Sequence, residues 1–293
     1  HATEIASHGV TIDLNGFDIV GVPGMGAFNG LVASQVGLAS INIINGTVRG
    51  WGGYGIDFRT AAANGGRIEG VTASGNNFTG IAAGHSFVIA RCASIANGSH
   101  GISNESGGVI TDCAASLNVS IGVNAGPGTS ILNCSSHDNS SHGIAADTGC
   151  TVTGCTSYVN GSNGIAATVG ATVVGCTVSR NIGDGISAGS DCTIRGNGCY
   201  SNGLNAGNGS GIAASGFDNH IEGNKCSDAD FGIRIINGGN VVFGNTCAGN
   251  TTNWDVASGN VCLVVQSVTS GTINGNAGGV SPGSTNPWAN FTY

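Results

Sequence analysis

The sequence predicts an all-β fold, a right-handed parallel β-helix solenoid with about 21 residues per coil and three short strands per coil. The first observation is a cysteine that returns every 21 residues through the middle of the chain. The second is a pair of further columns in the same register, one of asparagine and one of glycine followed by a β-branched residue. The cysteine column is Cys92, Cys113, Cys134, Cys155 and Cys176. The asparagine column is Asn76, Asn97, Asn118, Asn139, Asn160 and Asn181. The glycine column is Gly80, Gly101, Gly122, Gly143, Gly164 and Gly185.

Each coil is expected to contain three strands, because three short segments per repeat alternate with a period of two. One strand carries the cysteine, one follows the Gly-Ile pair, and the third includes segments such as 151–153. Glycine and asparagine separate these segments, and both accept the left-handed backbone that tight turns need. No segment shows the spacing of an amphipathic helix. Coils of this kind stack at about 4.8 Å, so equivalent residues should form ladders.

The register divides the chain into a β-helix over residues 1–255 and a C-terminal capping tail over 256–293. The first coils, 1–70, are irregular, as terminal repeats usually are, and the regular coils run from 71 to 198. The steps from Cys176 to Cys199 and on to Cys226 are 23 and 27 residues, which predicts insertions at turns within 199–255. Residues 204–210 are expected to form a surface bulge.

The composition excludes several function classes. Charged residues make up only 8% of the 293 residues, the net charge is −8, and Lys225 is the single lysine. Nucleic acid is therefore not expected as a partner, because phosphate binding needs clustered Lys and Arg. A polyanionic glycan would be repelled unless local groups or a cation such as Ca²⁺ compensated. No apolar run is long enough to predict a membrane span.

The repeated asparagine and cysteine residues each permit a structural and a functional interpretation. Asparagine at one turn of every coil can bind backbone groups and its stacked neighbours, or it can present amides to a glycan; the first is favoured. Stacked cysteines lie within disulfide range. The number of cysteines is 11, which is odd, and the column faces inward, so free buried thiols are favoured. No C-x-x-C motif indicates a thiolate metal site.

A cluster of polar side chains is predicted on one outward column. The position three after the column cysteine should face outward, and it places His137 and Tyr158 in adjacent coils. The next position carries Asp138 and Arg180. A base, an acid and a cation are what β-elimination of a uronate requires. Chance alignment of polar residues on a solenoid is the alternative interpretation, and it is favoured.

A second polar column precedes the column glycine. Its members are His100, Ile121, His142, Asn163 and Asp184. His142 and Asp184 are two coils apart, about 10 Å at the stacking distance, so they cannot share a metal directly. These positions are interpreted as turn residues.

The repeat units resemble a known family. Gly154-Cys155-Thr156-Ser157 and Asn163-Gly164-Ile165-Ala166-Ala167 are similar to units of bacterial right-handed parallel β-helix proteins of the pectate-lyase-like superfamily. The segments 9–17, 45–52 and 286–291 resemble the same family, so the similarity covers nearly the whole chain. The resemblance implies a role on polysaccharides, because members include lyases, hydrolases, epimerases and adhesive surface proteins. The paired-Asp motif of polygalacturonase-type hydrolases and the dense Asp set of Ca²⁺-dependent pectate lyases are both missing.

Together these observations predict a secreted or surface-exposed, bacterial protein that binds a glycan or builds an extracellular structure, without clear catalytic machinery. The alternative is a polysaccharide lyase or epimerase whose site contains His137, Tyr158, Arg180 and Asp138. Whether the chain is an enzyme is left open. No cofactor and no metal are expected, with calcium as the one ion left open. The expected partner is a polysaccharide or cell-surface glycan, and self-association is left open.

Overall fold

The computed structural model describes residues 2–59, 63–204, 207–266, 272–275 and 288–293. Throughout these ranges the chain forms short β-strands joined by turns and bends, and no helix occurs in them. The described part therefore contains no helix long and apolar enough to cross a membrane. The chain divides into two compact units, residues 1–145 and 146–293, and each is described by itself.

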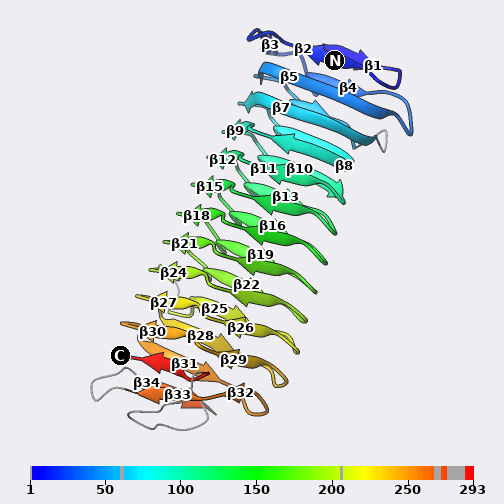
Figure 1. Cartoon of the computed structure of the whole chain (residues 1–293). Coiled ribbons are helices and arrows are strands. Elements are labelled where there is room, and N and C mark those ends of the chain that lie inside the picture. Colours follow the sequence, from blue (N-terminus) through cyan, green and yellow to red (C-terminus); the bar gives the residue numbers. More distant parts are fainter. Residues whose placement is uncertain (1, 60–62, 205–206, 267–271, 276–287) are drawn as a thin grey trace. The chain divides into compact units, whose positions relative to one another are not determined.

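The first unit consists of three parallel sheets, in which strands of successive coils pair edge to edge (Figure 1). Sheet 1 contains β1 (Thr3–Ile5), β4 (Leu31–Ala33), β6 (Ile56–Asp57), the start of β8 (Ile81–Ala90), β10 (Ile102–Ser106) and β13 (Val123–Ala125). Sheet 2 contains β2 (Thr11–Asp13), β5 (Ala39–Arg49), β7 (Asn64–Ser74), the end of β8, β11 (Val109–Thr111) and β14 (Ser130–Leu132). Sheet 3 contains β3 (Asp18–Val20), the ends of β5 and β7, β9 (Ala93–Ile95), β12 (Ala114–Ser116) and β15 (Ser135–His137).

The second unit repeats this plan. Its part of sheet 1 contains β19 (Ile165–Ala167), β22 (Ile186–Ala188), β25 (Ser210–Ala214), β28 (Phe231–Ile235), β31 (Thr252–Val256) and β34 (Thr272–Gly275). Sheet 2 contains β17 (Thr151–Thr153), β20 (Thr172–Val174), β23 (Thr193–Arg195), β26 (His220–Glu222), β29 (Val241–Phe243) and β32 (Val261–Cys262). Sheet 3 contains β18 (Thr156–Tyr158), β21 (Thr177–Ser179), β24 (Gly198–Tyr200), β27 (Lys225–Ser227), β30 (Thr246–Ala248), β33 (Val264–Gln266) and β35 (Asn290–Thr292). The residues of β16 (Ile144–Ala146) span the boundary between the two ranges.

Aliphatic ladders fill the interior of each unit. In the first unit Ile81, Ile102 and Val123 are paired in register and fully buried, which confirms the inward column predicted after the glycines. Because side chains alternate along each strand, the residue that follows each of these inward positions points away from the interior. The predicted all-β fold with three strands per coil is therefore correct.

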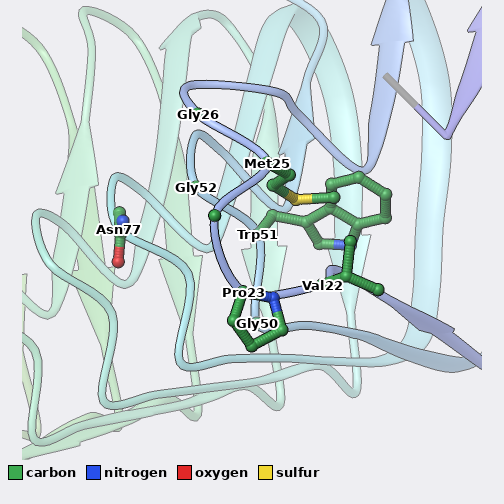
Figure 2. Close-up of a pocket in the computed structure, with 9 residues that line it drawn as sticks. Val22, Pro23, Met25, Gly26, Gly50, Trp51, Gly52 and Asn77 are labelled. Carbon is green, nitrogen blue, oxygen red and sulfur yellow. The ribbon is translucent and has the colours of Figure 1, made fainter.

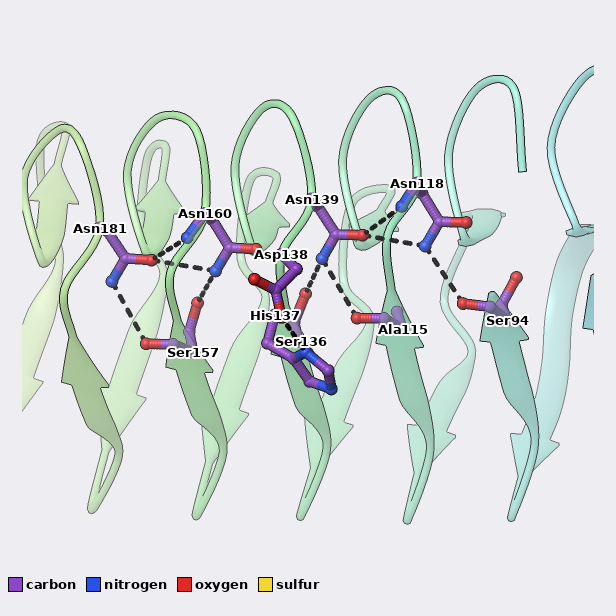
Figure 3. Close-up of polar contacts among 10 residues, drawn as sticks. All are labelled: Ser94, Ala115, Asn118, Ser136, His137, Asp138, Asn139, Ser157, Asn160 and Asn181. Carbon is purple, nitrogen blue, oxygen red and sulfur yellow. Dashed lines mark hydrogen bonds and ion pairs between the residues drawn. The ribbon is translucent and has the colours of Figure 1, made fainter. Parts of the chain in front are cut away.

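In each unit, asparagine side chains form a hydrogen-bonded ladder at the corner between sheets 3 and 1 (Figure 3). The Asn118 Oδ1 accepts both the backbone N–H and the side-chain Nδ2 of Asn97, each at 3.0 Å. Its Nδ2 donates to the carbonyl of Ser94 at 3.1 Å and to Asn139 Oδ1 at 2.9 Å. In the second unit Asn160 donates to Asn181 Oδ1 in the same way. The ladder thus satisfies buried backbone groups, as predicted for a structural role.

The column cysteines are free and buried, as are all 11 cysteines. The sulfur of Cys113 accepts the backbone N–H of Cys92 at 3.4 Å, and it donates to the carbonyl of Ile89 at 3.5 Å. At this corner, between sheets 2 and 3, cysteine therefore fills the place that asparagine fills at the neighbouring corner. The predicted stack of buried thiols is therefore present, and their reduced state in solution stays a prediction. The prediction that a strand carries each cysteine is wrong, because Cys92 and Cys113 lie at the corner just before β9 and β12.

The predicted insertion between Cys176 and Cys199 is wrong. Cys176 is followed one coil later by Asn197, after 21 residues, and Cys199 pairs instead with Val178. The cysteines after residue 190 thus belong to other columns, because the coil length and not the residue type decides which residues stack. The insertion falls wholly in the next coil, where Cys199 and Cys226 pair over a 27-residue step.

The base of that insertion is narrow. The backbones of Gly203 and Gly209 pass so close that a side chain on either glycine would collide with the other. Leu204, beside Gly203, is exposed. This agrees with the expected bulge at 204–210, of which residues 205 and 206 lie outside the described residues.

Part of the C-terminal tail is woven into sheet 3. The strand β35 pairs with β30 on one edge and with β33 on the other, so the last strand of the chain lies between two strands that precede it. Asn290 continues the column of the corner between sheets 2 and 3, and its Oδ1 accepts the N–H of Asn245 at 3.0 Å. Tail residues 267–271 and 276–287 lie outside the described residues, so the capping role expected for 256–293 stays a prediction.

Candidate functional site

Two of the predicted site residues lie in the first unit. His137 ends β15 with its side chain 29% exposed, and Asp138 follows in the turn with a positive φ of 53°. His137 Nδ1 lies 2.7 Å from Asp138 Oδ2 (Figure 3). A carboxylate that accepts the Nδ1 proton fixes the imidazole so that Nε2 is the basic nitrogen. The pair can therefore act as an oriented proton acceptor.

The other two predicted residues lie in the second unit. Tyr158 ends β18 and faces outward, as its position in the 21-residue repeat predicts. Arg180 occupies the exposed turn after β21, with a positive φ of 55°. The arrangement of His137 and Asp138 relative to Tyr158 and Arg180 stays a prediction from the repeat.

The structure adds a residue that the sequence analysis missed on the same outward column. Tyr158 pairs in register with Ser179, and Ser179 pairs with Tyr200, so the two tyrosines are two strands apart, or about 9–10 Å. The side chain of Tyr200 is 42% exposed. Its signal in the sequence was hidden, because Cys199 was assigned to the wrong column.

A pocket opens beside Tyr200. It has a volume of about 210 Å³ and is lined by Gly198, Cys199, Tyr200, Lys225, Ser227 and Asp228. The pocket is deepened because Gly198, which has no side chain, occupies the position that Thr177 occupies one coil earlier. Lys225 pairs directly with Gly198 and is exposed. An aromatic ring and an ammonium group thus flank a hollow on a sheet of small residues.

In the second unit, Arg234 interacts with two carboxylates, directly with Asp255 and through its charge with Asp184. Arg234 Nε binds Asp255 Oδ2 at 3.2 Å, and its guanidinium lies 4.7 Å from the centre of the Phe231 ring. Asp184 accepts the N–H of Ser210 at 2.8 Å. Burial raises the pKa of Asp184, while the hydrogen bonds from Ser210 and the charge of Arg234 oppose that rise. Asp184 is thus a bonded turn residue, in agreement with its interpretation from sequence.

A metal site is not formed by side chains in the described ranges, where no three His, Cys, Asp or Glu residues converge on one point. Thiolate ligation is opposed at Cys199 and Cys226. The hydrogen bond with Cys226 and then burial raise the pKa of Cys199 well above the ordinary value, and at Cys226 burial is the main cause of the same rise. The role left open for calcium stays a prediction.

The fold defines a β-helix protein, and the comparison with family models identifies the family. Residues 29–199 match the model described as the right-handed beta helix region, which covers more than half of the chain. The chain belongs to this family. No curated protein matches its sequence.

Solved structures of low sequence identity share the fold. The A-module of the mannuronan C-5 epimerase AlgE6 from Azotobacter vinelandii has a TM-score of 0.59 and 16% identity, over 87% of this chain and 69% of that one. The periplasmic alginate epimerase AlgG has a TM-score of 0.64 and 12% identity, over 98% and 75%. A tailspike protein variant of the E. coli bacteriophage HK620 has a TM-score of 0.52 and 12% identity, over 98% and 66%. At these identities the likeness establishes the fold alone.

Proposed function

We propose that this protein binds acidic polysaccharides outside the cytoplasm, through sheet 3 of its second unit. The observation that carries the proposal is the pocket between Tyr200 and Lys225. The fold neighbours named as alginate and mannuronan epimerases act on polysaccharides, and one is named as periplasmic, which supports the same substrate class and compartment.

Tyr200 supplies a flat apolar surface for the C–H face of a sugar ring. The outward neighbours in register are Ser179 and Ser227, so no large side chain covers the ring from the adjacent strands. Tyrosine also offers a hydroxyl that can bond a sugar hydroxyl. A chain of sugars lying across the strands would pass from Tyr200 toward Tyr158 along the same column.

The charge of Lys225 sets the class of glycan. The whole chain carries a net charge of −8, which repels polyanions at long range. Lys225 is the only lysine, and it lies at the pocket, while Arg180 lies on the exposed turn beside the same sheet. These two cations provide local compensation for sugar carboxylates. Asp228 also lines the pocket and offsets part of the charge of Lys225.

The test is a titration of the protein with oligomannuronate and oligogalacturonate by calorimetry. Tyr200→Ala should weaken binding about tenfold, as expected for loss of roughly 1 kcal/mol of aromatic contact. Lys225→Met should weaken it a few-fold and reduce its salt dependence. Phe217→Ala removes another exposed ring of the second unit and serves as the matched control. Equal binding by the control and by Tyr200→Ala would refute the site.

A second function, uronate lyase or epimerase activity, is favoured by the His137–Asp138 pair. In β-elimination the base takes the proton beside the sugar carboxylate, the C4–O bond breaks, and the leaving oxygen takes a proton. An epimerase would instead return a proton to the opposite face of the same carbon. His137 would be the base, with Tyr158 as the acid and Arg180 facing the carboxylate, as the sequence predicts.

Unsaturated product absorbance detects the lyase, and proton exchange into the polymer measured by NMR detects the epimerase. Either activity should be lost in His137→Ala and in Tyr158→Phe. No activity on any uronate polymer in the unmodified protein would exclude this second function and would leave the binding proposal intact.

A further inference from the structure

The first unit contains a stack of side chains that runs from a buried carboxylate to an exposed aromatic ring. Asp57 is 1% exposed, and its Oδ1 binds Arg59 Nε at 3.2 Å. The Arg59 guanidinium lies 4.6 Å from the centre of the Tyr54 ring. Tyr54 stacks on Phe78, with ring centres 5.3 Å apart and planes 18° from parallel. Phe78 is 44% exposed and ends the stack.

The stack holds the Phe78 ring more rigidly than an isolated surface ring would be held. The side chain of Asp57 also accepts the backbone N–H of Arg59 at 3.3 Å, which holds the arginine from two directions. The N–H of Tyr54 donates to Asn29 Oδ1 at 3.0 Å, and the N–H of Phe78 donates to the carbonyl of Gly53 at 3.0 Å. Both aromatic residues are therefore fixed at the backbone as well as by their rings. A ring held in this way loses little entropy when a ligand stacks on it.

A cavity of the first unit reaches the residue that precedes Phe78, although Phe78 itself does not line it. Its volume is about 320 Å³, and Asn77, the preceding residue, contributes to its wall. Figure 2 shows the loop with Val22, Pro23 and Met25 around Trp51, and Asn77 on a neighbouring turn. The remaining wall is largely glycine, so backbone groups are accessible within it. The cavity thus combines apolar side chains with amide donors and acceptors.

The electrostatic character of the stack is close to neutral. Asp57 and Arg59 balance each other. Asp18 and Arg49, next to the cavity residue Gly50, also form an ion pair. The pKa of His100 is lowered by burial and by the charge of Arg59, which favours its neutral form. This differs from the second unit, where Lys225 flanks the pocket.

We propose that Phe78 and Asn77, positioned by Tyr54 and Arg59, form a second carbohydrate site that binds a neutral pyranose. The sugar ring stacks on Phe78, and its hydroxyls bond the Asn77 amide and the backbone of the cavity. A neutral sugar fits because no uncompensated charge faces the cavity. The inference extends the proposed glycan binding to a second sugar class and a separate site.

The experiment titrates the full chain with neutral β-glucan, galactan and mannan fragments, and separately with oligouronates. At least one neutral class should bind, and Phe78→Ala should weaken that binding about tenfold, with an unchanged melting temperature. Tyr54→Ala should weaken it as well, whereas Tyr54→Phe keeps the stack and should bind like the unmodified protein. Phe17→Ala, another exposed ring of the first unit, is the control and should change nothing.

Binding at the two proposed sites can be tested separately. Tyr200→Ala and Lys225→Met should leave neutral-sugar binding unchanged. The inference is overturned if no neutral fragment binds, or if Phe78→Ala binds like the unmodified protein, even where oligouronates bind. Binding of neutral fragments alone would support this site and refute the proposed acidic-glycan function.

Discussion

Cys176 and Asn197 occupy the same corner of consecutive coils, and the backbone N–H of Cys176 donates to Asn197 Oδ1 at 2.8 Å. Asn197 Nδ2 donates to the carbonyl of Val173 at 3.0 Å, and the Cys176 sulfur donates to the corresponding carbonyl of Val152 at 3.7 Å. One corner therefore uses two residue types for one pattern of bonds. The longer sulfur distances mean that each thiol bond is weaker than its amide counterpart.

This equivalence predicts that asparagine can replace cysteine within the thiol ladder. Cys176→Asn should keep the melting temperature or raise it, because the amide can make the same bonds with shorter distances. Cys176→Ala should cost about 1–3 kcal/mol, since it leaves a buried N–H and a buried carbonyl without partners. Chemical denaturation measures both. A larger loss for Cys176→Asn than for Cys176→Ala would show that packing volume, and not hydrogen bonding, governs this column.

Removing one member of the asparagine ladder should be costly in the interior of a unit. Asn118→Ala deletes the acceptor for the N–H of Asn97 and the donors to Ser94 and Asn139. We expect a loss of about 1–3 kcal/mol in the free energy of unfolding. The exposed neighbour Ser140→Ala provides the control. If the two variants melt together, the ladder does not contribute to stability.

Acid should destabilise the protein through two partly buried histidines. Burial lowers the pKa of His100 and of His142, with the charge of Arg59 contributing at His100. In the unfolded chain both take up a proton near pH 6.5, whereas the folded protein resists it until lower pH. The unfolded state therefore binds more protons in that window, and stability falls as the pH falls through it. His100 also uses Nδ1 to accept the N–H of Ile121 at 3.3 Å, a bond that protonation removes.

The measurement compares melting temperatures at pH 7.5 and at pH 5. The unmodified protein should lose more stability over this interval than the double variant His100→Gln, His142→Gln. The variant His220→Gln, at a half-buried position on the outer face, is the control and should lose as much as the unmodified protein. Identical pH profiles for all three proteins would contradict the assignment.

The fold can be predicted from the sequence because, in a solenoid, residues that are one repeat length apart in the sequence contact each other in adjacent coils. Once Cys92 and Cys113 were placed one coil apart, the outward column that contains His137 followed from counting. The same counting failed where coil length changed. Tyr200 and Lys225 escape prediction because the 23-residue step from Cys176 to Cys199 is not one coil: Cys199 pairs with Val178 and belongs to another column.

The site in the first unit was beyond this method for a related reason. Coils near the N-terminus have a different length, since Leu31, Ile56 and Ile81 pair in register at steps of 25 residues. Without a constant period, nothing in the sequence places Phe78 against Tyr54. The ion pair that supports them is likewise a product of local backbone geometry around Asp57 and not of the repeat.

The position of β35 has a consequence for how the molecule comes apart. A solenoid that ends in its last coil can peel from its terminus, one strand at a time. Here β35 pairs with β30 on one edge and with β33 on the other, and Asn290 is hydrogen-bonded to Asn245, which lies 45 residues earlier in the sequence. Because β35 lies between β30 and β33, we expect it to separate before those two strands can part, so it should protect this part of sheet 3 against fraying.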